Sequence, residues 1–132
     1  MNAKQRQLRH TDYLEHMLEA VRLARMYSNG LTKAEFIADK KTQQAVILNL
    51  LVIGEAATHI ASEHPDFAEQ HPEFPWKQMR GMRNRMAHGY FEINLDIVWD
   101  TVRQSLAALE QQIIQIQARL ERQPPGNADR SK

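Results

Sequence analysis

The sequence predicts an all-α protein, an up-and-down bundle of four main helices that dimerises. Apolar residues recur at steps of three and four through several long segments, which is the spacing of amphipathic helices. Glycine, proline and capping residues separate these segments, and we see no alternating strand pattern of useful length. A chain of 132 residues is the length of one domain. We expect this helical domain to occupy residues 1–122, and residues 123–132 to form a disordered tail.

The first part of the chain reads as one long helix followed by a short one. Residues 12–27 carry apolar side chains at helical spacing, and Gly30 is typical of the position just past a helix end. Thr32 and Glu35 then have the arrangement of a capping box, in which each side chain bonds the backbone of the other residue. We therefore expect a short helical segment around Phe36.

The second long segment is the most apolar in the chain. Between residues 45 and 61 the apolar side chains fall nearly all round the helix, and Thr42 is placed to cap it. Such a helix either runs through the middle of the bundle or divides its faces between the core and a second subunit, which predicts a homodimer. Glu55 lies in its middle and needs a partner. We favour a structural ion pair, or a position on a hydrated seam, slightly over support for an active site.

The remaining elements are a connector and two helices. Residues 64–76 hold three prolines and form a connector with room for one helical turn, and Pro75 suits the first residue of the next helix. That helix runs to His88, where Gly89 suggests a break. Asn94 can cap the last helix. The long amphipathic stripe of this helix consists of Leu95, Val98, Val102, Leu106, Leu109, Ile113, Ile116 and Leu120.

Composition narrows the class of protein. The formal net charge is +1, so an electrostatic function must come from local clustering and not from bulk charge. The chain has no cysteine, which excludes disulfides and thiolate metal sites and suits the cytoplasm. We expect no signal peptide, no membrane span and no cofactor. His59, His64 and His71 lack the spacing of zinc ligands, so we expect solvated polar residues and no metal site.

The stretch "RNRMAHGY", residues 83–90, is the strongest candidate site. Lys77, Arg80, Arg83 and Arg85 lie close together, and no acidic residue occurs between Glu73 and Glu92. Basic residues near a helix C-terminus stabilise the helix dipole by a few tenths of a kcal/mol to about 1 kcal/mol each, which explains the arginines alone.

That explanation leaves out His88 and Tyr90, which follow at once around a glycine. Arg83 and His88 are five residues apart, so a continuous helix turns them about 140° from each other. They can meet on one phosphate only if the helix ends or bends near His88, or if two copies of the motif face each other.

These residue types suit cleavage of a phosphodiester bond. The planar fork of Arg83 matches phosphate oxygens and can stabilise transition-state charge. His88 can move a proton to or from a ribose 2′-hydroxyl or a leaving 5′-oxygen, a contribution of roughly 10²–10⁴-fold. RNA carries its own nucleophile, so this chemistry needs no metal. The pattern of an arginine, four residues and a histidine is a weak signal by itself.

The surrounding sequence makes the pattern more specific. The stretches "KTQQAVILNLLVIGEAA" and "PWKQMRGMRNRMAHGYFEINLDIVW" and the order of the elements resemble the HepT-like toxins of the HEPN superfamily, over roughly residues 8–121. The family signature is an arginine, four to six residues, a histidine, any residue and a tyrosine. Arg83, His88 and Tyr90 match it, and Asn84 fills the position that is usually polar.

The resemblance implies an all-α dimer with two motifs in a shared cleft and metal-independent endoribonuclease activity. Arg83 and His88 would be catalytic, Asn84 would support them, and RNA would contact Lys77, Arg80, Arg85 and Tyr90. The resemblance also implies a toxin paired with a minimal nucleotidyltransferase antitoxin, which would neutralise it by transferring AMP to Tyr90. The added phosphate could then occupy Arg83.

Two other functions remain open at the level of the sequence. The chain can instead be a non-catalytic subunit of a nucleotidyltransferase complex, which holds a nucleotide or RNA in the same basic cleft. It can also be a plain helical dimerisation module, in which residues 83, 88 and 90 have no part in toxicity or ligand binding.

Overall fold

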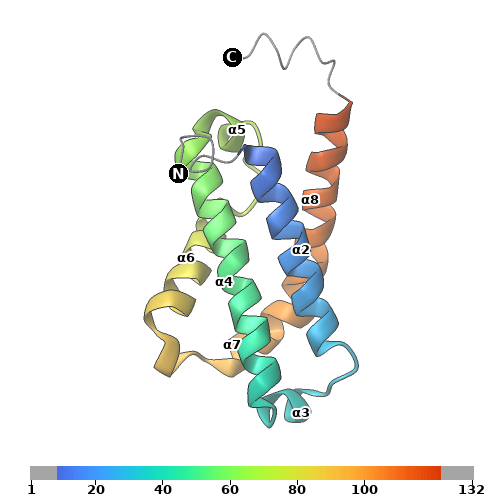
Figure 1. The fold of residues 1–132 in the computed structure, drawn as a ribbon, viewed down its shortest axis with the longest axis vertical. Helices are drawn as coiled ribbons and strands as arrows, with labels where there is room; N and C mark the ends of the chain where they lie inside the picture. Colours follow the sequence, from blue (N-terminus) through green and yellow to red (C-terminus); the bar gives the residue numbers. More distant parts are fainter. Residues whose placement is uncertain (1–8, 123–132) are drawn as a thin grey trace, which may run out of the picture.

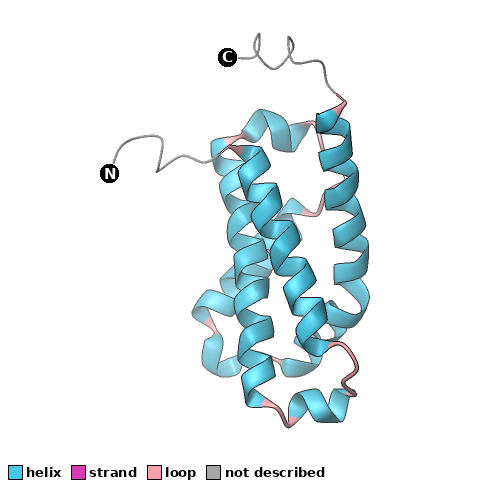
Figure 2. Ribbon diagram, turned by 45° about the vertical axis from the view of Figure 1, so that its right-hand side comes forward, coloured by secondary structure: helices cyan, strands magenta, loops and turns pink. Residues whose placement is uncertain are grey.

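The computed structural model describes residues 9–122, apart from the side chain of Tyr90, and every regular element in this range is helical (Figures 1 and 2). The predicted tail at 123–132 lies outside the described residues. The helices are α2 (His10–Ser28), α3 (Lys33–Ile37), α4 (Lys40–Glu63), α5 (Pro65–Glu69), α6 (Trp76–His88), the 3-10 turn η1 (Tyr90–Glu92), α7 (Leu95–Asp100), the π-helical turn η2 (Thr101–Ser105) and α8 (Leu106–Glu121).

The long helices run up and down in chain order, which confirms the predicted all-α bundle. In Figure 1, α2 runs downward, α4 returns upward, α6 runs downward, and α7 and α8 carry the chain back up. The core lies between these helices and consists of their apolar faces. Its largest fully buried side chains are Phe36, Leu14, Met17, Leu50, Ile53, Ile60, Leu106, Ile113, Ile116, Val21, Val46 and Val98.

Helix α4 runs through the middle of the bundle and packs against both α2 and α6. By length and composition alone it could also cross a membrane, which the sequence prediction of no span did not anticipate. Half of its most apolar window is buried inside the protein, however, and the core helix of a water-soluble protein passes the same test. Its packing therefore accounts for its composition.

Most of the predicted helix ends are confirmed, and two are wrong. Pro75 caps α6 and does not begin it, since the first residue of that helix is Trp76. Thr32 and Glu35 form the expected capping box, and Gly30 adopts a φ of 83°, which glycine tolerates best. Helix α4 begins at Lys40, two residues before the predicted cap Thr42. Its cap is Asp39, whose carboxylate accepts hydrogen bonds from the Thr42 backbone N–H and hydroxyl. A carboxylate three residues upstream can reach both donors, so it takes the capping position.

The last predicted helix is not one regular helix. Asn94 caps it as predicted, since its Oδ1 accepts hydrogen bonds from the backbone of Asp96 and Ile97. The wider π-helical turn of residues 101–105 then interrupts the regular α-helical geometry between α7 and α8. The buried stripe passes through this turn in two successive steps of four, from Val98 to Val102 and on to Leu106. Such spacing fits a regular helix as well, so the sequence did not reveal the interruption.

Candidate functional site

Helix α6 carries the predicted motif and presents most of it to solvent. Met82 and Met86 are its buried residues and fix its orientation against the bundle. At 3.6 residues per turn, Lys77, Asn84 and His88 share the opposite face, and all three are exposed. The helix therefore displays its histidine and its polar neighbours as one outward stripe.

Arg83 lies at the edge of this face, where α6 meets α4. Its helix approaches α4 at Gly54: a Cβ atom at Gly54 would lie 2.5 Å from the Arg83 Cβ and 2.8 Å from the Met79 carbonyl oxygen. Only a residue without a side chain fits there. The close approach leaves the Arg83 side chain 24% exposed, with its Nε atom buried and without a hydrogen-bond partner. Arg83 is thus anchored at its base, and its guanidinium keeps one buried donor without a partner.

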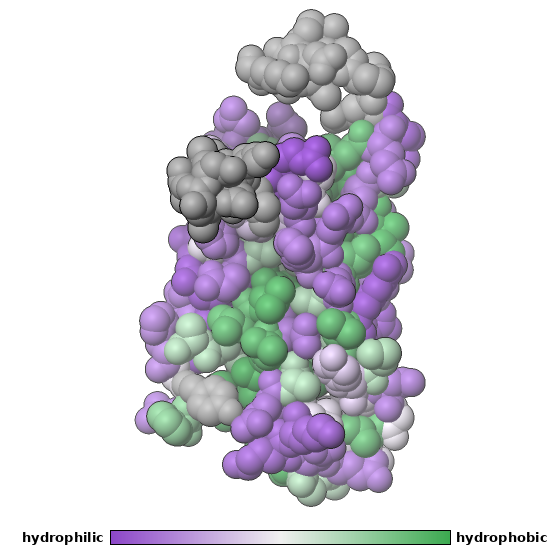
Figure 3. All heavy atoms as spheres, viewed as in Figure 1, coloured by the Kyte–Doolittle hydropathy of each residue, from purple (hydrophilic) through white to green (hydrophobic). Residues whose placement is uncertain are grey.

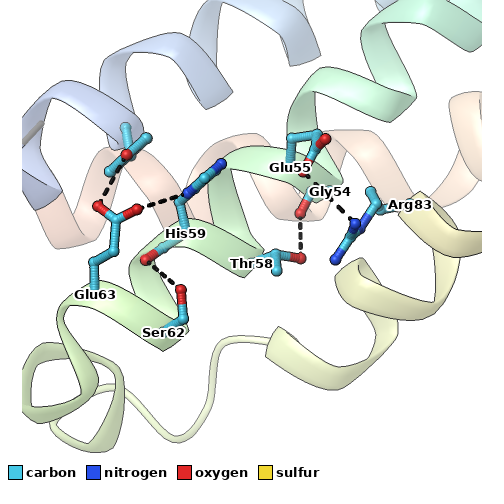
Figure 4. Close-up of polar contacts among 8 residues, drawn as sticks. Gly54, Glu55, Thr58, His59, Ser62, Glu63 and Arg83 are labelled. Carbon is cyan, nitrogen blue, oxygen red and sulfur yellow. Dashed lines mark hydrogen bonds and ion pairs between the residues drawn. The ribbon is translucent and has the colours of Figure 1, made fainter. Parts of the chain in front are cut away.

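The residue after Gly54 provides the partner for this arginine. The Glu55 carboxylate Oε1 lies 3.9 Å from Arg83 Nη1 (Figure 4). Glu55 is not buried as its apolar surroundings suggested, since 47% of its side chain is exposed. The predicted ion pair therefore exists, but its partner is the central arginine of the motif. Glu55 thus lies beside a residue of the motif.

The position of His88 settles one of the two geometries proposed from the sequence. Helix α6 continues through His88 and ends there, and the Gly89 backbone N–H donates to the Arg85 carbonyl oxygen at 3.1 Å. The break at Gly89 is confirmed, but it follows the histidine and so does not redirect it. Arg83 and His88 consequently stay about 140° apart on one helix. Within one chain they do not converge.

The other predicted site residues lie near Arg83 and His88, but they are on different sides of α6. Arg80 and Arg85 are exposed, on different sides of α6. Tyr90 begins the turn η1 directly after Gly89. Around the helix axis, Arg80 lies between Arg83 and Asn84, whereas Arg85 lies beyond His88. The basic patch therefore wraps the exposed half of α6.

The three histidines near the connector do not form a metal site. His59 pairs with Glu63 at 2.8 Å, one helical turn apart, and Glu63 also accepts a hydrogen bond from the Tyr13 hydroxyl at 3.0 Å (Figure 4). The hydrogen bond from His59 is the main cause that lowers the pKa of Glu63. His71 is buried, which contradicts the prediction of a solvated residue. In residues 9–122, no three His, Cys, Asp or Glu side chains are grouped to hold a metal ion.

Sequence reasoning missed Gly54. A lone glycine in the middle of an apolar helix often marks a close approach of two backbones, so the signal was present. It was not read because Gly54 and Arg83 are far apart in sequence. Nothing in the sequence indicates which helix comes close at that point.

Proteins of known families match most of the helical domain. The profile of the family described as "Ribonuclease HepT-like" matches residues 17–116. A probable ribonuclease HepT from Thermococcus cleftensis is 40% identical over 101 residues, which are 76% of this chain and 89% of that protein. A protein of Methanocaldococcus jannaschii named as a candidate RNase is 43% identical over 91 residues, 69% of each chain.

A third relative matches over a similar length. A protein of Caldanaerobacter subterraneus, also named as a candidate RNase, is 34% identical over 104 residues, which are 79% of this chain and 90% of that protein. No solved structure is a significant match. The match to the family profile covers α4, α6 and the motif, as well as most of α2 and α8. The chain belongs to the ribonuclease HepT-like family, which confirms the resemblance and the ribonuclease class predicted from the sequence.

Proposed function

We propose that the protein is a metal-independent endoribonuclease whose catalytic residues are Arg83 and His88. The proposal depends on the positions of these two side chains in a chain that belongs to a ribonuclease family. The Arg83 side chain is anchored against α4 and remains 24% exposed, and His88 stands exposed at the end of the same helix. One is placed to bind a phosphate and the other to exchange protons with it.

The chemistry follows from the substrate. The ribose 2′-oxygen attacks the adjacent phosphorus and loses its proton to a base, while the bond from phosphorus to the 5′-oxygen breaks and that oxygen takes up a proton. His88 serves in one or both transfers, and Arg83 stabilises the charge on the phosphate oxygens. The products would end in a 2′,3′-cyclic phosphate and a 5′-hydroxyl. A substrate with 2′-deoxyribose at the cleavage site should not be cut.

We propose further that the active site is completed by a homodimer. Leu48 is 58% exposed, and it shares the outward stripe of α4 with Leu51, Val52 and Glu55. Figure 3 shows hydrophobic surface over the middle of α4. A second copy packed on this stripe would cover apolar surface and bring two motifs together, since Glu55 of the stripe lies beside Arg83. This arrangement would overcome the separation of Arg83 and His88 within one chain.

Mixing two inactive variants tests this arrangement. Arg83→Ala and His88→Ala proteins are purified separately and then allowed to exchange subunits. If Arg83 of one subunit acts with His88 of the other, each mixed dimer holds one intact site and the mixture regains cleavage. A mixture as inactive as its components would show that both residues act from the same chain. A monomer mass by light scattering at micromolar concentration would contradict the dimer itself.

We also propose that the protein is the toxin of a toxin–antitoxin pair. A minimal nucleotidyltransferase would neutralise it by transferring AMP to the Tyr90 hydroxyl. Tyr90 follows the exposed end of α6 by two residues, so an AMP group there would lie close to His88 and the basic patch. The phosphate of the AMP group would compete with RNA for the arginines. Its adenosine would obstruct the proposed cleft between the two motifs of the dimer.

Co-expression with the neighbouring nucleotidyltransferase gene tests this regulation. Intact mass should increase by whole AMP groups, Tyr90→Phe should abolish the increase, and the modified protein should not cut RNA. Growth arrest by the unmodified protein that disappears in His88→Ala would support the toxin role. RNA binding without cleavage products in a clean assay would favour the non-catalytic subunit instead.

A further inference from the structure

A small pocket opens at the C-terminal end of α6, between that helix, the turn η1 and α7. Its volume is about 240 Å³. This is below the roughly 300–1,000 Å³ of pockets that enclose drug-sized ligands, so it suits a single flat group. The apolar residues Met86, Ile93 and Ile97 line it together with the polar residues Arg85, Glu92 and Asn94.

The pocket adjoins the motif histidine. Arg85 precedes His88 by three residues on α6, so the two are neighbours on the helix surface. Gly89, which directly follows His88, also lines the pocket. A group bound there would be the unit next to a phosphate held at His88. In a nucleic acid that unit is a nucleoside.

The polar residues around the pocket differ in the hydrogen bonds that they can make. The Asn94 Oδ1 already accepts hydrogen bonds from the backbone of Asp96 and Ile97, at 2.9 and 3.2 Å, so its amide group is left to donate. The Glu92 carboxylate can only accept when it is ionised. Arg85 adds a positive charge that suits a phosphate. The residues around the pocket thus offer one acceptor, one donor and one cation beside apolar side chains.

An exposed aromatic residue is next in sequence to the pocket residue Glu92. Phe91 lies next to Glu92 in the turn η1 and is 99% exposed. Exposure of a whole phenyl ring is costly in water, and single-stranded nucleic acids stack their bases on such rings. Stacking is tolerant of sequence because every base has a π-face. Phe91 can therefore hold a base without selecting it, whereas the pocket can select one.

We propose that this pocket binds the base of the nucleotide beside the scissile phosphate and prefers a base with an exocyclic amino group over uracil. Phe91 would stack on a neighbouring base. The exocyclic amino group of adenine, cytosine or guanine would donate to Glu92. Uracil can donate only from its ring N3–H, and the carbonyl oxygens on either side of that group would repel the carboxylate. The inference rests on the proposed function, since it takes the substrate to be RNA.

Binding of uncut RNA tests the inference most simply. In the His88→Ala protein, fluorescence anisotropy is measured with labelled oligocytidine and oligouridine of the same length, which differ only at the pairing edge of the base. We expect cytidine to bind at least about fivefold more tightly, the lower end for one base-edge contact. Adding Glu92→Gln should reduce the ratio to about twofold or less, because the amide also offers a donor to uracil.

Two further variants make the result specific. Glu69→Gln removes another exposed carboxylate, on α5, and should leave the cytidine preference intact. Phe91→Ala should weaken binding of both RNAs by similar factors. Equal affinities for the two RNAs, or a preference that survives Glu92→Gln, would overturn the pocket assignment. An unchanged Phe91→Ala affinity would overturn the stacking role.

The same data separate this inference from the proposed ribonuclease activity. If the unmodified protein cuts no RNA but the Glu92-dependent preference is present, the catalytic proposal fails and the pocket stands. If the protein cuts RNA and binds cytidine and uridine alike, the catalytic proposal stands and the pocket fails. Thermal melts of each variant confirm that the compared proteins are folded.

Discussion

The Glu55 carboxylate lies 3.9 Å from the Arg83 guanidinium, across the contact between α4 and α6. Both side chains are partly exposed, so this pair contributes at most about 1 kcal/mol to stability. The main effect of the pair is to orient the Arg83 side chain. Arg83 has an anchored base and an unused Nε donor, and the carboxylate limits the directions its guanidinium can take.

Replacing Glu55 tests this positioning role. Glu55→Gln keeps the size of the side chain and removes its charge, so we expect the free energy of unfolding to change by less than about 1 kcal/mol. Cleavage at saturating RNA should fall several-fold, because Arg83 is less well oriented. Single-turnover kinetics and urea unfolding measure the two quantities. Glu55→Asp should recover part of the rate, and wild-type kinetics in Glu55→Gln would rule out the role.

The approach of α6 to α4 depends on Gly54. In Gly54→Ala the new Cβ would lie 2.5 Å from the Arg83 Cβ, so the helices must separate, at a cost of roughly 1–3 kcal/mol. Gly81→Ala is the matched control. Its Cβ would meet nothing closer than 3.5 Å, and alanine favours a helix over glycine by about 0.5–1 kcal/mol. Urea unfolding should thus show a lower free energy of unfolding in Gly54→Ala and a higher one in Gly81→Ala. Equal changes in the two variants would refute this explanation of the packing.

The planar fork of Arg83 is more than a positive charge. Arg83→Lys keeps the charge but loses the five fixed donors, so we expect cleavage to fall about tenfold or more while RNA binding changes less. Lys77→Arg on the outward face provides the comparison and should have little effect on rate. Single-turnover rates measure this difference. If Arg83→Lys cuts RNA as fast as wild type, Arg83 contributes only its positive charge.

A histidine at the other end of the bundle should make stability depend on pH. Burial is the main cause that lowers the pKa of His10 from its ordinary 6.5; His64, Arg9 and His71 act in the same direction, and Asp12 opposes them. The unfolded chain then binds the proton more tightly than the folded protein. The contribution of His10 is therefore complete above about pH 6.5 and is lost as the pH falls through its lower folded pKa.

Urea unfolding between about pH 7.5 and pH 5.5 measures this contribution. His10→Phe keeps a ring stacked on Phe67 and should lose less stability on acidification than wild type, whereas His16→Gln at an exposed site should behave as wild type. The carboxylates with lowered pKa values, such as Glu110, lose their contribution only below about pH 4.5 and do not interfere. Identical pH dependence in His10→Phe and wild type would contradict the assignment.

Local signals in the sequence predicted most of the fold. The capping box of Thr32 and Glu35, the cap at Asn94 and the helix end at His88 depend on neighbouring residues, and all are confirmed. The cap at Asp39 was missed because Thr42 offered an equally good local choice.

The contacts that shape the site are not local. The pairing of Glu55 with Arg83 and the gap left by Gly54 depend on which helices touch, and periodicity alone does not specify this. The motif residues themselves were identified because their spacing and surroundings match a family signature. Their geometry then showed that one chain leaves Arg83 and His88 apart.

The central claim is that His88 takes part in cutting RNA. Its most direct test is the single-turnover cleavage rate of purified wild type and His88→Ala, with a chelator present and thermal melts to confirm folding. His88 is exposed, so its removal should leave stability nearly unchanged. We predict a rate lower by roughly 10²–10⁴-fold, with products of the wild type ending in a 2′,3′-cyclic phosphate. A His88→Ala protein that cuts RNA as fast as wild type would contradict the account.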